Sequence, residues 1–291
     1  MRRGTFASVL VLTAVLLAGC TAPAPSPAAS SGGATGVRIE RSIVYRTVEG
    51  RSLAAEACLP VPARRAPALV LVHSGGFSQG SRTDLEFVCT AAARAGIATF
   101  SVDYRLLPAR YPAQAQDVAA AVAWLGEPAQ QRRFSLRPGR IALLGTSAGA
   151  VVAAQLATRT PGSPLDPRTL SAVVLMSGLY DANGDLGGLQ SVADAYLGCA
   201  DGSASCVATR RKASAVDAAS KGDPPMLLVG SRDEIVPLSQ LQGFASALQR
   251  AGVPHSQLVV DGDAHAEAVL VSEPSAAGTV LAFLQRAFAA R

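Results

Sequence analysis

The chain has 291 residues, of which 26 are Lys or Arg, 21 are Asp or Glu, and 49% are hydrophobic. Without Arg2 and Arg3, which lie in a leader segment, 24 basic residues stand against 21 acidic ones, an excess of only three. This small excess, with no Lys/Arg run and no interleaving of basic and aromatic residues, argues against nucleic-acid binding. About 255 residues follow the leader and a short low-complexity segment, enough for one large α/β domain.

Residues 1–19 have the pattern of a secretory signal. Two arginines precede an apolar stretch at residues 6–17, which is too short to span a membrane. The segment ends in LAGC at residues 17–20, which resembles the bacterial lipobox, where the cysteine thiol takes a lipid before cleavage. We therefore predict a bacterial lipoprotein that is exported, begins at Cys20, and is anchored by acyl chains to a membrane surface outside the cytoplasm. An ordinary signal peptide with an incidental cysteine is the alternative.

Residues 20–36 predict a flexible tether. After Cys20 the sequence is TAPAPSPAASSGGATG, with no charge and no large apolar side chain. Such a segment buries too little apolar surface to offset the entropy of ordering it. We therefore expect the folded domain to cover residues 37–291.

Four cysteines remain in the predicted domain: Cys58, Cys89, Cys199 and Cys206. An even number in an exported protein favours disulfides. Cys199 and Cys206 would close a short loop and are the favoured pair, which leaves Cys58 with Cys89; four free buried thiols are the alternative. The chain has three histidines and no C-x-x-C motif, so we expect no metal site and no cofactor.

Hydrophobic patterning predicts an α/β fold. Continuous apolar runs of four to six residues are typical of strands buried on both faces of a parallel sheet. We expect such strands at 68–72, 97–102, 141–144, 172–176, 226–229 and 257–260, after an antiparallel pair at 37–48 and 53–59. Helical stretches alternate with them at 82–95, 113–125, 148–159, 238–251 and 276–289. This alternation predicts a mostly parallel sheet of eight strands, flanked by helices.

Residues 180–223 interrupt the alternation after the sixth strand. The segment is rich in Gly, Asp and Ser and contains two of the cysteines. Long excursions of this kind are usually functional. We predict a small cap insertion over the active site, braced by a disulfide; an ordinary surface insertion is the alternative.

The sequence GTSAG at residues 145–149 lies between an apolar strand and an Ala/Val-rich helix. That junction is where a nucleophile elbow presents its serine. The turn forces the serine into a strained conformation, and glycines on both sides relieve the crowding. Since the short pattern alone is weakly specific, Ser147 is a candidate nucleophile only if a base and an oxyanion site converge on it.

A serine nucleophile needs a histidine base that a carboxylate orients. His265 follows the last predicted strand and therefore lies at the same sheet edge as Ser147, whereas His255 precedes that strand. Asp233 follows the strand at 226–229, and the chain order Ser147, Asp233, His265 is the order expected of the fold that carries such an elbow. We predict these three as the catalytic triad, with Glu234 and Asp263 as the alternative acids.

The sequence HSGGF at residues 73–77 follows the third predicted strand. Glycines allow backbone N–H groups to approach a substrate closely, and such donors stabilise the developing oxyanion. We assign the oxyanion hole to the N–H groups of Gly75, Gly76 and Ala148. His73 then shapes the loop rather than acting as a base.

Five motifs together resemble the α/β-hydrolase esterase family, and most closely its hormone-sensitive-lipase-like and bacterial carboxylesterase branch: HSGGF, DYRL at 103–106, GTSAG, RDEIVP at 232–237 and GDAH at 262–265. The resemblance implies the α/β-hydrolase fold and a serine hydrolase that cleaves small, short-chain carboxylic esters through an acyl-enzyme. In that family the aspartate and arginine of the Asp-Tyr-Arg stretch brace the oxyanion loop. The resemblance therefore assigns a supporting role to Asp103 and Arg105.

The chain also departs from the family pattern. Ser74 and Thr146 replace a usual glycine and a frequent aspartate, and Ala150 replaces the second elbow glycine. The N-terminal helical cap of the hormone-sensitive-lipase-like enzymes is also missing, because residues 21–36 do not have a helix-forming sequence. These differences are similar to those of feruloyl- and acetyl-esterase-like and formamidase-like relatives. Amide hydrolysis, by a formamidase or a prolyl-oligopeptidase-like peptidase, is the alternative activity, and a non-catalytic lipoprotein scaffold is a remote one.

Overall fold

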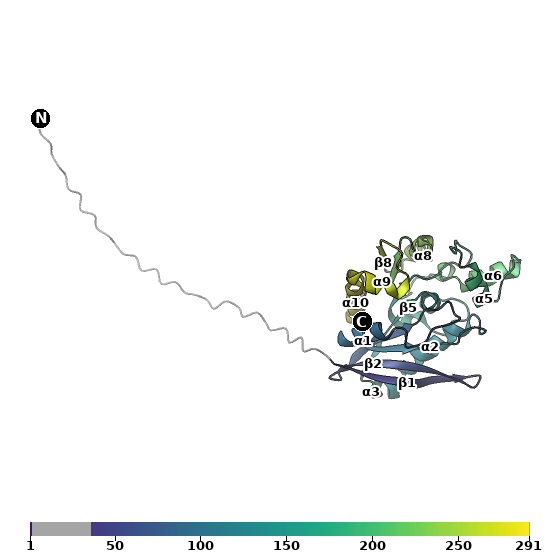
Figure 1. Cartoon of the computed structure of the whole chain (residues 1–291). Coiled ribbons are helices and arrows are strands. Elements are labelled where there is room, and N and C mark those ends of the chain that lie inside the picture. Colours follow the sequence, from purple (N-terminus) through teal and green to yellow (C-terminus); the bar gives the residue numbers. More distant parts are fainter. Residues whose placement is uncertain (2–35, 291) are drawn as a thin grey trace. The chain divides into compact units, whose positions relative to one another are not determined.

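A computed structural model of the chain describes Met1 and residues 36–290. Its centre is one eight-stranded sheet with the order β1-β2-β4-β3-β5-β6-β7-β8 (Figure 1). The first two strands pair antiparallel, β2 is antiparallel to β4, and all other neighbours are parallel. The predicted mostly parallel α/β sheet is confirmed. The strands are β1 Gly36–Val48, β2 Arg51–Val61, β3 Ala66–Val72, β4 Ala98–Val102, β5 Leu136–Thr146, β6 Leu170–Met176, β7 Met226–Ser231 and β8 His255–Val260.

Helices cover both faces of the sheet, because alternate side chains of a strand point to opposite faces. In β3, Val70 and Val72 belong to one buried cluster, whereas Leu69 and Leu71 belong to the other. The first cluster includes side chains of α2 (Ala113–Gly126), α4 (Ala148–Ala157) and α8 (Leu238–Ala251). The second includes side chains of α1 (Glu86–Arg94) and α10 (Pro274–Ala289). The inner strands β3, β4, β6 and β7 are therefore buried on both faces, as their continuous apolar sequences require, whereas the edge strands β1 and β8 are partly exposed.

Several elements differ from the sequence prediction. The helix expected at 82–95 begins only at Glu86, and α10 begins two residues early, at Pro274, where a proline at the first helical position costs no hydrogen bond. The short helices α3 (Pro128–Arg133) and α9 (Val269–Ser272) and the 3₁₀ turns at Pro167–Thr169 and Ala266–Ala268 are not predicted. Each is too short to produce a helical hydrophobic period.

Three helices occupy the segment between β6 and β7: α5 (Gln190–Leu197), α6 (Ala204–Ala213) and α7 (Ala215–Ala218). The helix α5 packs against the loop after β3, where the Tyr196 and Phe77 rings stack with centroids 3.7 Å apart. The backbone N–H of Tyr111 also donates to the Tyr196 carbonyl at 3.0 Å. The segment predicted as a cap thus contacts the loops at the carboxyl edge of the sheet.

The structure contains both predicted disulfides. Cys58–Cys89 joins β2 to α1, and Cys199–Cys206 joins the end of α5 to α6. The Cα–Cα distances of 5.7 and 5.4 Å are ordinary for such bonds. The favoured pairing is therefore correct.

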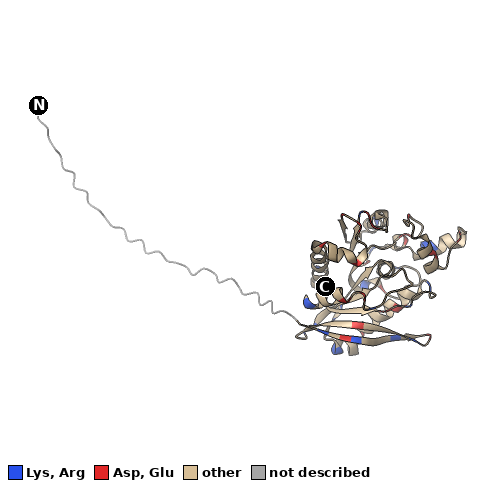
Figure 2. Cartoon of the chain, in the orientation of Figure 1, with Lys and Arg blue, Asp and Glu red and all other residues tan. Residues whose placement is uncertain are grey.

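The predicted signal, lipobox and tether lie outside the described residues. Within residues 36–290, no single helix has both the length and the mean hydropathy of a membrane span. Residues 266–272 and 274–289 have the required length and hydropathy only when taken together, and the two segments are bent by 112° relative to each other. The second segment is α10, which buries Ala276, Val280, Leu284 and Phe288 in the core. Basic and acidic residues are interspersed over the elements (Figure 2).

Candidate active site

Ser147 occupies the sharp turn between β5 and α4. Its backbone has φ +49° and ψ −116°, a conformation that is strained for a residue with a side chain. A Cβ on Gly145 would lie 2.3 Å from the Gly149 carbonyl oxygen, and one on Gly149 would lie 2.1 Å from the Val72 carbonyl oxygen. Both flanking positions therefore require glycine, as the elbow prediction demands.

The carboxylate that contacts His265 belongs to Glu234. Its Nδ1 lies 2.6 Å from Glu234 Oε2, and the Glu234 side chain is only 2% exposed. Asp233 instead is exposed, and its backbone N–H donates to the Gly262 carbonyl. The prediction of Asp233 as the triad acid is therefore wrong. Because β7 continues to Ser231, two residues beyond the predicted end, the turn directs residue 234 rather than 233 toward the histidine.

The second carboxylate oxygen of Glu234 is held by two donors. The backbone N–H of Ser231 and the hydroxyl of Ser177 each donate to Oε1 at 2.9 Å. The Ser177 oxygen in turn accepts the N–H of Ala266 at 2.9 Å, so it connects the acid loop to the histidine loop. Ser177 follows β6 with φ +56° and was missed by the sequence motifs. Its place directly after a strand at this sheet edge is the only signal that could have found it.

The oxyanion loop after β3 has the backbone shape that glycines permit. Gly75 and Gly76 have φ of +110° and +57°, and a Cβ on Gly75 would lie 2.1 Å from the Gln79 carbonyl oxygen. The Gly75 carbonyl accepts the N–H groups of Ser78 and Gln79, which closes the loop. In the described part of the chain, no hydrogen bond uses the N–H groups of Gly75, Gly76 or Ala148. These N–H groups are therefore free to bind an oxyanion.

These loops meet at a cavity of about 450 Å³ at the carboxyl edge of the sheet. Ser147 and His265 both line it, together with the three predicted oxyanion residues. Among the described side chains there is no hydrogen bond between Ser147 and His265; such bonds are often long until substrate is bound. The other lining residues come mostly from the oxyanion loop, the insertion and the acid loop: Ser74, Phe77, Ser78, Gln79, Val151, Ser177, Leu179, Leu189, Val192, Ile235 and Val236.

A family model described as alpha/beta hydrolase fold matches residues 69–269, more than half of the chain. The chain belongs to this alpha/beta-hydrolase family. The match spans β3 to the histidine loop, so it includes the oxyanion loop, the elbow, the acid loop and His265.

Most curated relatives of the chain are named lipases, esterases or ester hydrolases, and one is named an arylacetamide deacetylase. Carboxylesterase NlhH of Mycobacterium tuberculosis is 38% identical over 150 residues, which are 47% of this chain and 46% of the relative. Lipase 2 of a Moraxella species is 45% identical over 93 residues, 31% of this chain and 21% of the relative. The chain thus spans less than half of the length of these relatives.

Solved structures agree on the fold of the chain. An acetyl ester-xyloside bifunctional hydrolase from Caldicellulosiruptor lactoaceticus superposes with a TM-score of 0.72 at 19% identity, over 84% of this chain and 95% of that chain. An esterase from Pyrobaculum calidifontis gives 0.70 at 22% identity, over 86% and 85%. The predicted α/β-hydrolase fold is confirmed.

His73 supports the predicted oxyanion loop, residues 73–77. Its ring is buried, lies 2.7 Å through Nδ1 from the Ser74 carbonyl, and stacks on Tyr104 with centroids 4.3 Å apart. Tyr104 donates its hydroxyl to the His73 carbonyl at 2.9 Å. Burial lowers the pKa of His73, which favours the neutral ring. These contacts agree with the predicted role in shaping the loop.

The two other predicted supports differ from each other. Asp103 accepts the backbone N–H and the guanidinium of Arg82 at 3.0 and 2.6 Å, which fixes the chain that leaves the oxyanion loop. Arg105 instead contacts buried Asp117 through Nε at 2.7 Å and through its backbone N–H at 3.0 Å. Its assignment to the oxyanion loop is therefore corrected: Arg105 fixes the start of α2. This stretch contacts the oxyanion loop directly through Tyr104, whose hydroxyl donates to the His73 carbonyl at 2.9 Å, and through the following Leu107, whose backbone N–H donates to the Phe77 carbonyl at 2.8 Å.

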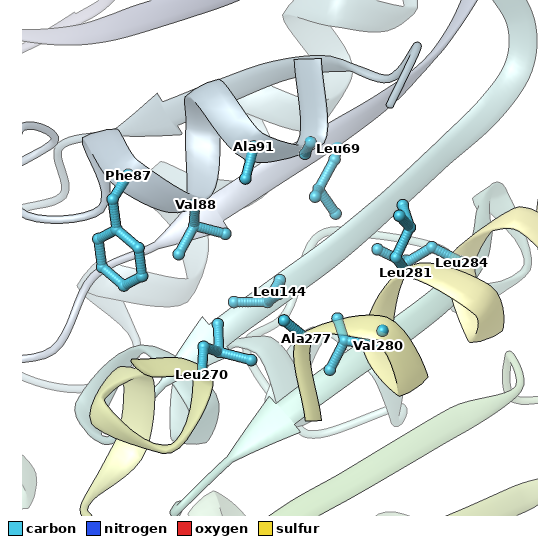
Figure 3. Close-up of a pocket in the computed structure, with 12 residues that line it drawn as sticks. Leu69, Phe87, Val88, Ala91, Leu144, Leu270, Ala277, Val280, Leu281 and Leu284 are labelled. Atoms are coloured by element: carbon cyan, nitrogen blue, oxygen red, sulfur yellow. The ribbon is translucent and has the colours of Figure 1, made fainter. Parts of the chain in front are cut away.

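A second cavity of about 290 Å³ lies between α1 and α10, on the face of the sheet away from α4 (Figure 3). All of its lining residues are apolar or glycine, among them Phe87, Val88, Leu270 and Leu281. It offers no nucleophile, base or hydrogen-bond donor from a side chain. Among the described residues there is also no cluster of three His, Cys, Asp or Glu side chains suited to a metal ion.

Proposed function

We propose that the protein is a serine esterase that cleaves short-chain carboxylic esters, with Ser147 as nucleophile, His265 as base and Glu234 as the orienting acid. The observation that carries the proposal is the 2.6 Å contact between His265 Nδ1 and Glu234 Oε2 beside the cavity that Ser147 lines. The esterase names of the relatives support the same reaction class. No metal or cofactor is required for this chemistry.

In the acylation half, the ester carbonyl carbon lies against Ser147 Oγ. His265 Nε2 removes the hydroxyl proton as the Oγ–C bond forms, and the carbonyl oxygen becomes an oxyanion. The imidazolium then gives the proton to the alcohol oxygen as the ester C–O bond breaks. In the deacylation half a water molecule repeats these steps, releases the acid and restores Ser147.

Glu234 acts through the histidine. Its Oε2 accepts the Nδ1–H, which leaves Nε2 unprotonated and able to take the Ser147 proton. Because Ser177 and Ser231 hold Oε1, the carboxylate has one orientation. Its buried negative charge also stabilises the imidazolium that forms in each half-reaction.

The N–H groups of Gly75, Gly76 and Ala148 are proposed to bind the oxyanion. Each donor of this kind commonly contributes about 2.7–4 kcal/mol to transition-state stabilisation. Two of them come from the glycine loop and one from the first residue of α4, whose N-terminal end favours negative charge.

Short acyl groups fit the walls of the cavity. Phe77 lines the cavity, and the Tyr196 ring stacks behind it and is fixed by a hydrogen bond to Gln155 at 2.9 Å. The hollow lined by these three side chains has only about 20 Å³, room for little more than one water molecule. A long acyl chain has no continuation there.

The test is turnover of p-nitrophenyl acetate by the wild-type chain and by Ser147→Ala, together with labelling by a fluorophosphonate probe. We expect the variant to lose both signals; activity that survives in Ser147→Ala would contradict the assignment. A panel of acetyl, butyryl, octanoyl and feruloyl esters with N-formyl and prolyl amides defines the substrate. The highest kcat/KM should occur for acetyl or butyryl, whereas preference for an amide or for octanoyl would overturn the corresponding part of the proposal.

For the location of the protein we propose a lipid anchor on Cys20. The sequence LAGC after the apolar stretch supports it, and the two disulfides agree with an oxidising compartment. When the full chain is expressed in a bacterium, Cys20→Ala should move the protein from the membrane to the soluble fraction. Retention of the variant in the membrane would contradict the anchor.

A further inference from the structure

Ser74 departs from the glycine that the resembling esterases have at this position, and its hydroxyl has a specific partner. Its Oγ donates to Glu267 Oε1 at 2.9 Å, across 193 residues of sequence. Ser74 precedes the proposed oxyanion donor Gly75, and Glu267 lies two residues after His265. The bond therefore joins the loop that carries the oxyanion donors to the loop that carries the base.

No other hydrogen bond among the described residues joins residues 73–80 to residues 261–272. The histidine loop has several bonds to the acid loop instead. The Arg232 N–H donates to Val260, the Asp233 N–H to Gly262, and the Ser231 hydroxyl to Ala264. The Ser74–Glu267 pair is therefore the one direct hydrogen-bonded link between the two loops in the described part of the chain.

We infer that Ser74 and Glu267 are positioning residues that set the oxyanion donors and the imidazole at the separation that the acyl-transfer transition state requires. The inference rests on the proposed esterase function. Catalytic groups must be held within about 0.5 Å of their productive positions, and an error of about 1 Å can lower the rate about 100-fold. A hydrogen bond to a carboxylate is about twice as strong as one between neutral groups, which suits it to fix two loops.

Burial makes this pair interdependent. The second oxygen of Glu267, Oε2, is buried and has no hydrogen-bond partner among the described residues. Ser74 is the only side chain that donates to this carboxylate in the described part of the chain. Without the Ser74 hydroxyl, the Glu267 carboxylate would be buried with no hydrogen-bond donor, so it would turn away from the oxyanion loop toward water.

A double-mutant cycle on the full chain tests the inference, with Ser74→Ala, Glu267→Ala and both together, assayed on p-nitrophenyl acetate. Each single variant should lower kcat about tenfold while KM changes less than about twofold, because the bond acts on the transition state rather than on binding. The double variant should be no slower than the slower single variant. Losses that multiply in the double variant would overturn the inference.

The conservative variant Glu267→Gln separates positioning from charge and from bulk. It keeps an acceptor oxygen of the same reach, so kcat should return to within about threefold of wild type, since a neutral hydrogen bond is about half as strong. A Gln variant as slow as the Ala variant would contradict the positioning role. Matched controls are the exposed Ser246→Ala and Glu127→Ala, whose side chains lie away from the site.

A second measurement tests the inference if the alanine variants fold poorly. Affinity for a trifluoromethyl ketone, which forms a tetrahedral oxyanion on Ser147, should fall about tenfold in Ser74→Gly, with KM for the ester unchanged. Equal losses in both would indicate a general structural effect and overturn the inference. If the wild-type chain neither turns over esters nor reacts with the fluorophosphonate, the proposed function fails instead, so the two failures are distinguishable.

Discussion

The acid–histidine side of the site and its oxyanion side are held by different kinds of contact. On the first side, hydrogen bonds between side chains fix Glu234 and His265, through Ser177 and the Ser231 N–H. On the second side, backbone conformation determines the geometry, with positive φ at Gly75 and Gly76. Substitutions that remove a functional group should therefore lower kcat most on the acid–histidine side, and substitutions that add an atom should lower it most on the oxyanion side.

The strongest test of this contrast is removal of the Glu234 carboxylate. Glu234→Ala should lower kcat on p-nitrophenyl acetate by about 10³- to 10⁴-fold, because the imidazole loses its correct tautomer and orientation. KM should change little, since the carboxylate does not touch the substrate. Steady-state kinetics on the purified chain measure both constants.

Asp233→Ala is the matched control for that variant. The Asp233 side chain is exposed, and the bond from its residue to Gly262 uses the backbone N–H, which alanine retains. Its activity should stay within about twofold of wild type, the usual range for a surface substitution. If Asp233→Ala is the inactive variant and Glu234→Ala the active one, the geometry of the acid loop is wrong.

This pair of neighbours also shows where sequence reasoning ends. Apolar runs predicted six of the eight strands, and the glycines around Ser147 predicted the elbow, because each pattern has one dominant local cause. The choice between Asp233 and Glu234 depends on where β7 ends and how the turn is directed, and both residues have the same chemistry. One residue of register decides which carboxylate faces His265, and strand ends are the least certain part of a sequence prediction.

The sequence motifs missed Ser177 and Glu267 for a different reason. Each acts through a contact with a residue far along the chain, at separations of 57 residues for Ser177–Glu234 and 193 for Ser74–Glu267. A single serine or glutamate in a loop has no periodicity or spacing that marks it. The role of Arg105 was misassigned because its partner, Asp117, lies on α2, outside the motif that suggested the role.

On the oxyanion side, the second largest effect should come from an added methyl group. Gly75→Ala places a Cβ 2.1 Å from the Gln79 carbonyl oxygen at φ +110°, so the loop has to move. Displacement of one oxyanion donor should lower kcat by about 10²- to 10³-fold. Gly50→Ala is the control, because Gly50 also has positive φ, at +72°, but nothing lies within 4 Å of its added Cβ. Its kcat should equal that of wild type, and an equal loss in both variants would show that backbone strain rather than displacement is responsible.

A smaller effect is expected for Ser177→Ala, which removes one contact from the acid side. Glu234 loses one donor and the Ala266 N–H loses its acceptor, but the Ser231 N–H and His265 still hold the carboxylate. We expect kcat to fall about tenfold and the free energy of unfolding to fall by about 1–3 kcal/mol, the cost of buried groups left unpaired. Kinetics and urea unfolding measure the two effects. Ser171→Ala, at the opposite end of β6, should leave kcat unchanged, and a loss there equal to that of Ser177→Ala would refute the link to Glu234.

The smallest effect concerns stability and pH on the oxyanion side. Burial lowers the pKa of His73 below its ordinary value of 6.5. As the pH falls through 6.5, the imidazole therefore takes up a proton in the unfolded chain while it stays neutral in the folded protein. Wild type should therefore lose stability relative to His73→Gln, which does not titrate, as pH falls below about 6.5, by at most about 1.4 kcal/mol per pH unit. The difference in unfolding free energy between the two proteins, measured in urea from pH 8 to 5, should be constant above 7 and shrink below 6.5. Every other titrating group is common to both proteins, so the difference reports on His73 alone. A difference that stays constant down to pH 5 would mean that His73 is protonated as readily in the folded protein as in the unfolded chain. The buried, neutral ring packed against Tyr104 would then not be the form that supports the loop.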